Sequence, residues 1–110
     1  MTDNFVEITE VGKLTDLLAL SNERPVVVFK HSAACGVSAR AYERVAELAV
    51  PIMLVVVQSA RALSNAIAVQ TGIEHESPQA IVFRNGKPVW FGSHSQITAE
   101  ALRGAIQEHE

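Results

Sequence analysis

The chain has 110 residues, of which 48% are hydrophobic and 19% charged, and these values fit one compact domain spanning residues 1–110. The formal net charge of −3 disfavours a nucleic-acid partner held through its phosphates, and no apolar run is long enough to cross a membrane. A single cysteine leaves no internal disulfide, and the N-terminus lacks the pattern of a signal peptide. We therefore expect a cytoplasmic protein rather than a secreted disulfide scaffold.

The first elements follow from apolar spacing and from breakers. Residues 5–8 alternate apolar and polar side chains, which predicts a short edge strand. A helix capped by Thr9 is expected next, and Pro25 disfavours its continuation. Residues 26–29 are continuously apolar, which is typical of a strand covered on both faces in a parallel sheet.

The middle of the chain predicts a helix, a strand and a second helix. Residues 36–49 have helical spacing, residues 52–57 read as a second buried strand, and a further helix ends at Gly72 as its C-cap. The side chains expected to face inward are Val37, Ala41, Val45, Leu48 and Ala49 in the first helix and Leu63, Ile67 and Val69 in the second.

The C-terminal part predicts a hairpin and a last helix. Asn85–Gly86 joins two predicted strands, residues 80–83 and 88–91, and is the strongest short hairpin signal in the chain. We expect Trp90 and Phe91 in the hairpin core, and Thr98 as the N-cap of the last helix.

The order of elements is strand, helix, strand, helix, strand, helix, strand, strand, helix. Early βαβ crossovers predict a parallel core, and the hairpin adds an antiparallel edge. This order is that of a thioredoxin-like fold. The predicted fold class is therefore α/β, with a central mixed sheet and helices on both faces.

The chain's lone cysteine, Cys35, follows the first buried strand and opens a helix with Gly36. Helix N-termini stabilise a thiolate through unpaired N–H groups and the macrodipole. The spacing to Ser38 resembles a Cys-x-x-Cys redox motif whose second sulfur is replaced by a hydroxyl, and we expect Ser38 to donate a hydrogen bond to the sulfur. These features indicate one-thiol redox chemistry; the alternative is a small buried cysteine with no reactivity.

A second predicted feature is the pair Ser77–Pro78, just before the strand at residues 80–83. Thioredoxin-like proteins carry a cis-proline at this place, beside the reactive thiol. We therefore expect a cis Ser77–Pro78 bond close to Cys35, with the backbone of Ser77 pairing with peptide-like groups of the incoming thiol.

Two basic residues, Lys30 and His31, end the strand before Cys35. They are candidates for adding positive charge near the thiolate or for holding a carboxylate of a small thiol; the alternative is that both are solvated loop residues. His75 and His94 are too scattered relative to Cys35 to indicate a metal site, so none is expected.

Several segments together resemble the bacilliredoxin family of the bacillithiol system, YtxJ type. They are Phe29-Lys30-His31-Ser32, Cys35-x-x-Ser38, His75-Glu76-Ser77-Pro78-Gln79, and Arg84-Asn85-Gly86-Lys87 with Val89-Trp90 and Ser93-His94. Family members usually have Thr-Cys-Pro-Ile-Ser around the thiol, whereas this chain has Ala34-Cys35-Gly36-Val37-Ser38, which predicts a less rigid loop.

The resemblance implies that Cys35 removes bacillithiol from protein cysteines and passes it to another thiol. Bacillithiol is then a co-substrate rather than a tightly bound cofactor, and the partners are this small thiol and S-thiolated client proteins. We expect a monomer.

Two other classes stay open from the sequence. Cys35-Gly36-Val37-Ser38 also resembles the Cys-Gly-Phe-Ser motif of monothiol glutaredoxins, which share an iron–sulfur cluster across a dimer using glutathione. The chain lacks the Trp-Pro-Thr-x-Pro and Gly-Gly-x-Asp segments of those proteins. The third class is a thioredoxin-fold binding module with an unreactive thiol.

Overall fold

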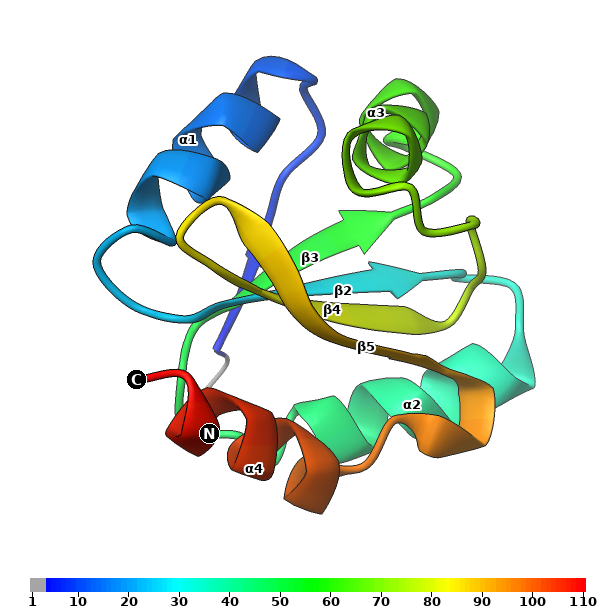
Figure 1. The fold of residues 1–110 in the computed structure, drawn as a ribbon. Coiled ribbons are helices and arrows are strands. Elements are labelled where there is room, and N and C mark those ends of the chain that lie inside the picture. Colours follow the sequence, from blue (N-terminus) through cyan, green and yellow to red (C-terminus); the bar gives the residue numbers. More distant parts are fainter. Residues whose placement is uncertain (1–3) are drawn as a thin grey trace.

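The computed structural model describes residues 4–110. In this part of the chain a mixed sheet lies between two layers of helices, with α1 and α3 on one face and α2 and α4 on the other (Figure 1). The strands are β1 (Phe5–Glu7), β2 (Val26–His31), β3 (Ile52–Val56), β4 (Gln79–Arg84) and β5 (Lys87–Ser93). The helices are α1 (Gly12–Leu20), α2 (Gly36–Val45), α3 (Arg61–Thr71) and α4 (Ala99–Glu108), with a 3₁₀ turn η1 (His94–Gln96). This confirms the predicted α/β class.

The strand order is β1-β3-β2-β4-β5. As predicted, β1, β3 and β2 are parallel, whereas β4 and β5 add an antiparallel hairpin. Lys30 at the end of β2 pairs with Gln79 at the start of β4. The carboxyl ends of β2 and β3 and the start of β4 therefore lie at the same end of the sheet (Figure 1).

Residues 26–29 are all apolar because strand β2 is buried on both of its faces. Side chains on a strand point alternately to its two faces, and here each face carries its own apolar cluster. Phe29 packs in the cluster beneath α2 and α4, and Val28 packs in the cluster beneath α1 and α3. No helix among residues 4–110 is long and apolar enough to span a bilayer.

The turn between β4 and β5 confirms the hairpin prediction. Asn85 and Gly86 have φ values of 55° and 77°, the left-handed conformations that a two-residue turn of this kind requires. The Gly86 N–H donates to the Ser21 Oγ over 2.8 Å, and an Arg84 Nη1 donates to the Ser21 carbonyl over 2.9 Å. The turn is thereby tied to the end of α1.

The buried stripe of α2 differs from the prediction. Val37 is 51% exposed and Ala49 is exposed and lies beyond the helix, which ends at Val45. The buried positions are Ser38, Ala41 and Val45, whose spacing of three and four residues marks one helical face. The sequence pattern failed because Ser38 is polar and was not counted in the stripe.

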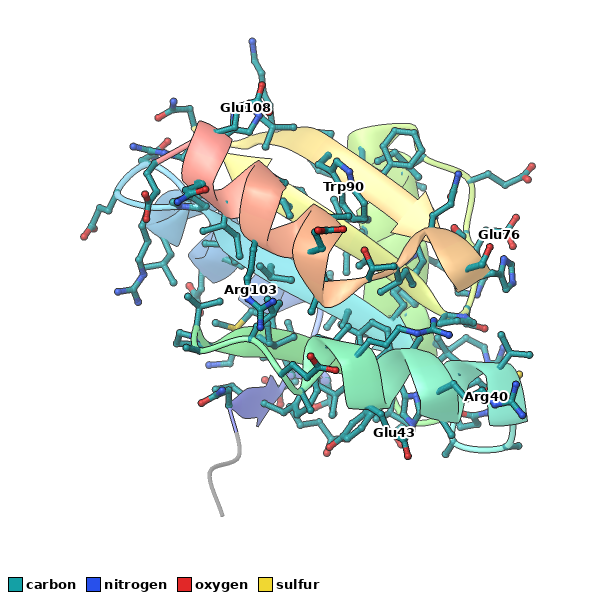
Figure 2. All side chains as sticks on the ribbon, turned by 90° about the horizontal axis from the view of Figure 1, so that it is seen from below. Arg40, Glu43, Glu76, Trp90, Arg103 and Glu108 are labelled. Carbon is teal, nitrogen blue, oxygen red and sulfur yellow. The ribbon has the colours of Figure 1, made fainter. Side chains whose placement is uncertain are left out.

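Three further predictions are corrected. Thr9 does not cap α1, whose N-cap is Val11. Val69 is 85% exposed on the outer side of α3. Phe91 is 58% exposed, because it lies on the edge strand β5 beyond the helices of that face, whereas Trp90 packs against the core (Figure 2).

The cap of α4 provides a test of this fold. The Thr98 Oγ1 accepts a hydrogen bond from the Ala101 N–H over 3.0 Å. Thr98→Ala is expected to lower the free energy of unfolding by about 1 kcal/mol, because it leaves this N–H without its acceptor. Urea unfolding measures this change, with Thr9→Ala as the matched control that leaves the midpoint in place. Equal losses in the two variants would contradict the observed helix starts.

Candidate active site

Cys35 is the residue directly before α2, and its side chain is half-buried. Its backbone is extended, with φ −118° and ψ 124°, while its carbonyl accepts the first helical bond, from the Ala39 N–H over 3.0 Å. This is N-cap backbone geometry, although within the described residues the Cys35 side chain accepts no capping hydrogen bond from the first turn of α2. The position suits a nucleophilic thiolate.

Ser38 anchors the loop that carries the thiol. Its side chain is fully buried, its Oγ accepts from the Ser32 N–H over 2.9 Å, and the His31 Nδ1 lies 2.7 Å from the same oxygen. Within the described residues, no hydrogen bond joins Ser38 to the Cys35 sulfur. The prediction that Ser38 donates to the sulfur is therefore wrong. The hydroxyl instead fixes the path of the chain from β2 to α2.

Gln58 holds the same loop from the other side and was not identified from the sequence. Its Nε2 donates to the Ser32 Oγ over 2.9 Å, and its Oε1 accepts from the Ala33 N–H over 3.2 Å. Gln58 follows β3, whose carboxyl end lies beside that of β2. The rule that sites gather beyond the carboxyl ends of parallel strands is the signal that points to it.

His31 lies against aromatic rings rather than in solvent. Its ring centroid is 5.8 Å from that of Phe29 and 5.0 Å from that of Tyr42. Burial lowers the pKa of His31 below its usual 6.5, so the ring is largely neutral at pH 7. His31 therefore contributes to the site through its contact with Ser38 rather than as the positive charge that the sequence suggested.

Lys30 points to the opposite face of the sheet and is fully buried. Its Nζ donates to the Ser64 carbonyl of α3 over 3.0 Å and contacts the His75 Nδ1 at 3.3 Å. Burial lowers the pKa of Lys30 to about 8. None of the three roles considered from the sequence describes a lysine enclosed between β2 and α3: it is not a solvated loop residue, a charge beside Cys35 or an accessible partner for a carboxylate of a small thiol.

His75 links Lys30 to the segment before Pro78. Its Nδ1 also lies 3.1 Å from the Ser64 Oγ, and because a lysine ammonium has no acceptor, this nitrogen is unprotonated when it accepts from Lys30. Burial lowers the pKa of His75, Lys30 and Arg61 lower it further, and Glu76 opposes them. The segment is thus fastened to β2 and α3.

The Ser77–Pro78 peptide bond is cis, and Pro78 is buried. Gln79, the next residue, pairs with Lys30 at the end of β2, and the Pro78 carbonyl accepts from the His94 N–H of η1 over 3.2 Å. Turn η1 packs against α2. The Ser77–Pro78 pair therefore lies at the same end of the sheet as the loop that leads to Cys35 (Figure 1).

The remaining histidines lie on three different segments of the chain. His94 lies 3.8 Å from a carboxylate oxygen of Glu76, His75 is engaged by Lys30, and His109 lies at the end of α4. Figure 2 shows Glu76 beside the turn that follows β5. No group of three or more His, Cys, Asp or Glu side chains in residues 4–110 is arranged to hold a metal ion.

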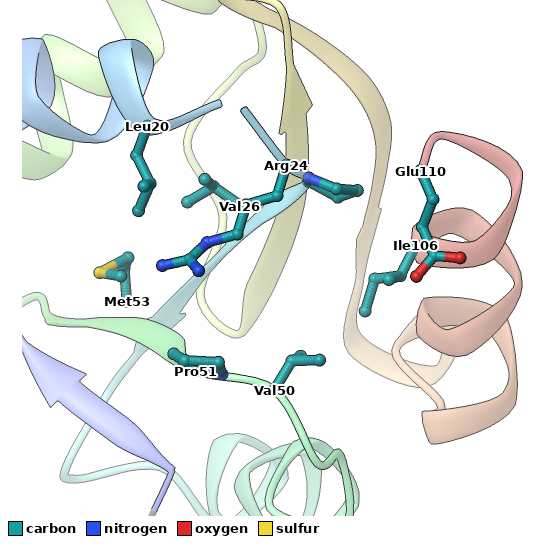
Figure 3. Close-up of a pocket in the computed structure, with 9 residues that line it drawn as sticks. Leu20, Arg24, Val26, Val50, Pro51, Met53, Ile106 and Glu110 are labelled. Carbon is teal, nitrogen blue, oxygen red and sulfur yellow. The ribbon is translucent and has the colours of Figure 1, made fainter. Parts of the chain in front are cut away.

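A hollow of about 210 Å³ lies at the other end of the sheet (Figure 3). It is lined at the starts of β2 and β3 by Val26 and Met53, with Arg24 and Glu110 at its rim. Because β2 and β3 are parallel, their starts lie a strand length away from the end of the sheet that carries Cys35. None of the predicted site residues lines this hollow.

Residues 6–102 match the family described as Monothiol bacilliredoxin BrxC. The chain belongs to this family. A solved structure described provisionally as an oxidoreductase with a thioredoxin fold is 33% identical, with 92% of each chain covered and a TM-score of 0.82. Membership in the family makes the chain a thiol–disulfide oxidoreductase, and Cys35 is the one thiol that its sequence offers.

The fold itself is shared with thioredoxins. Fasciola hepatica thioredoxin is 21% identical, with 94% of this chain and 98% of that chain covered and a TM-score of 0.73. Schistosoma mansoni thioredoxin is 16% identical, with 99% and 100% covered and a TM-score of 0.74. These similarities confirm the predicted thioredoxin-like fold.

This bacilliredoxin family member has Gly36 as the first residue of α2. Gly36 is exposed, and a Cβ added to it would meet nothing within 4 Å. Proline is favoured at the first helical position, where its missing N–H breaks no helical bond. The space around a Cβ at this position is therefore open, and the resemblance leads us to expect a proline there.

Lys30 predicts a pH dependence of stability. Its folded-state pKa of about 8 lies below the unfolded value of 10.5, so the unfolded chain binds more protons between these pH values and stability rises with pH. From pH 7 to 9.5 the gain relative to Lys30→Met is at most about 2 kcal/mol. Urea unfolding at both pH values measures it. The exposed Lys87→Met is the matched control, and a wild-type slope equal to that of Lys30→Met would refute the prediction.

Gly36 predicts a stabilising substitution. Gly36→Pro is expected to raise the free energy of unfolding by about 0.4–1 kcal/mol, because proline restricts the unfolded chain more than glycine does. Thermal unfolding of Gly36→Pro and of the intermediate variant Gly36→Ala measures the gain. A proline variant less stable than wild type would show that the Gly36 N–H or its backbone freedom is needed.

Proposed function

We propose that Cys35 removes bacillithiol from mixed disulfides on protein cysteines by a monothiol route. The observation that carries the proposal is the position of the chain's lone cysteine at the N-cap of α2, half-buried, with Ser38 where a resolving cysteine would otherwise sit. The choice of bacillithiol as the small thiol is supported by membership in the bacilliredoxin family.

The first step is a thiol–disulfide exchange. The Cys35 thiolate attacks the bacillithiol sulfur of the mixed disulfide, the bond from that sulfur to the client cysteine breaks, and the client leaves as a thiolate that takes a proton from water. Cys35 now carries the bacillithiol cap. No net oxidation has occurred, because one disulfide has replaced another.

The second step restores Cys35. A second thiolate, from free bacillithiol or from a partner protein, attacks the bacillithiol sulfur, and Cys35 leaves as a thiolate. Over both steps the client disulfide is reduced by two electrons, and the incoming thiol is oxidised to a new disulfide with bacillithiol. Because this thiol comes from outside, one cysteine in the chain is enough.

In this proposal two further residues support the exchange in different ways. Ser38 fixes the loop through the Ser32 N–H, so that the thiol stays at the helix start. The backbone of Ser77, at the end of the sheet that carries Cys35, would pair with peptide-like groups of the capped cysteine or of the small thiol. Neither step requires a tightly bound cofactor.

The transfer of the cap tests the proposal. We expect a bacillithiol-capped substrate protein to lose its cap to wild-type Cys35 and not to Cys35→Ser, as followed by mass spectrometry. Ser38→Ala is expected to slow transfer several-fold without abolishing it, because the loop loses a buried anchor and the nucleophile remains. Ser21→Ala is the matched control, since Ser21 is an equally buried serine that binds backbone groups at the far hairpin turn.

Other outcomes identify the competing functions. A cap that stays on the substrate after long incubation with wild-type protein would refute the proposal and favour a binding module with an unreactive thiol. Equal transfer from a glutathione-capped substrate would leave the route in place and remove the specificity for bacillithiol. Purified protein that is brown and contains iron and sulfide would favour the cluster-carrier class.

A further inference from the structure

A groove of about 500 Å³ lies between the end of α3 with the loop that follows it and the outer part of β5. The residues that matter for its chemistry are Ile73, Glu74, Glu76, Gln79, Pro88 and Phe91. Glu76 and Gln79 flank the Ser77–Pro78 pair in the chain, so the groove lies next to this segment of the candidate active site.

The apolar side of the groove is formed by Phe91 with Pro88 and Ile73. Phe91 is 58% exposed, and it lies on β5, the last strand of the sheet. The exposed ring of Phe91 gives the groove an apolar side together with Pro88 and Ile73, whereas Ile81, which pairs with Phe91 on β4, packs in the core. This side of the groove is suited to cover by an apolar side chain.

The polar side of the groove offers acceptors and negative charge. Glu74 is exposed at its rim, and Glu76 lies 3.8 Å from His94 and near enough to His75 to oppose the lowering of its pKa. Gln79 is 1% exposed, and its Nε2 donates to the Glu74 carbonyl over 2.9 Å. Its Oε1 is the buried side-chain atom that lacks a hydrogen-bond partner within residues 4–110. A ligand with N–H donors and positive charge complements these groups.

We propose that this groove binds the client polypeptide next to its thiolated cysteine, with an apolar side chain against Phe91 and a lysine or arginine beside Glu74 and Glu76. The inference rests on the proposed function for its biological meaning, because a client cysteine that reaches Cys35 brings its neighbouring residues past Ser77–Pro78. An acidic client segment would meet two carboxylates and bind more weakly.

Peptide binding tests the groove without turnover. The protein is the Cys35→Ser variant, and the probes are the amidated peptide Gly-Lys-Leu-Ser-Leu-Lys-Gly and the same peptide with both lysines replaced by glutamate. We expect the lysine peptide to bind about fivefold or more tightly than the glutamate peptide at low salt, with the difference shrinking as salt rises. NMR titration measures the affinities and shows whether the amides of Glu74 and Phe91 shift.

Matched variants locate the effect. Glu74→Lys is expected to remove the preference for the lysine peptide, whereas Glu23→Lys, an exposed charge reversal just before β2, keeps it. Phe91→Ser is expected to weaken both peptides about fivefold, whereas Val69→Ser, which removes another exposed apolar side chain, does not. If Phe91→Ser fails to fold, the exposed Glu74→Lys still decides the question.

Two results would overturn the groove proposal. One is equal affinity of the Cys35→Ser protein for the two peptides, and the other is an equal effect of Glu74→Lys and Glu23→Lys on the preference for the lysine peptide. The cap-transfer assay is a separate measurement. Peptides that bind as expected in a protein that transfers no cap would refute the proposed function and leave the groove in place. Cap transfer by a protein that binds the two peptides equally would refute the groove proposal and leave the proposed function in place.

Discussion

The central strand β2 determines how the site is held, because it ends in two residues that point to opposite faces of the sheet. His31 faces α2 and contacts Ser38, which fixes the loop to Cys35. Lys30 faces α3 and contacts His75, which fixes the segment that leads to Ser77–Pro78. The thiol and the proline segment are therefore positioned by neighbouring residues of one strand, whose own position is set by pairing with β3 and β4.

Lys30 is a costly way to position a loop. A buried ammonium loses its hydration, and here its contacts are a carbonyl and an imidazole rather than a carboxylate. The lowered pKa of Lys30 expresses that cost. In return, its contacts fix the distance between β2, α3 and the segment before Pro78. On the other face the loop is held by Ser38 and Gln58 through neutral hydrogen bonds, in a chain that has Gly36 rather than proline at the helix start.

Neither basic residue at the end of β2 supplies a positive charge to Cys35, which lies at the N-cap of α2. His31 is largely neutral at pH 7, and the Lys30 ammonium lies across the sheet. The buried hydroxyl of Ser38 does not contact the sulfur; it holds the loop that leads to Cys35 by accepting from the Ser32 N–H.

The sequence by itself determined the order of elements, the left-handed turn at Asn85–Gly86 and the place of Cys35 at a helix start, because each depends on residues close together in the chain. It did not determine the partners of Lys30 and Ser38. A strand-end lysine is solvated or buried according to what packs above it, and here that is Ser64 of α3 and His75, which are distant in sequence. Only the tertiary structure decided this, because backbone preferences are local whereas burial and hydrogen-bond partners depend on which segments the sheet brings together.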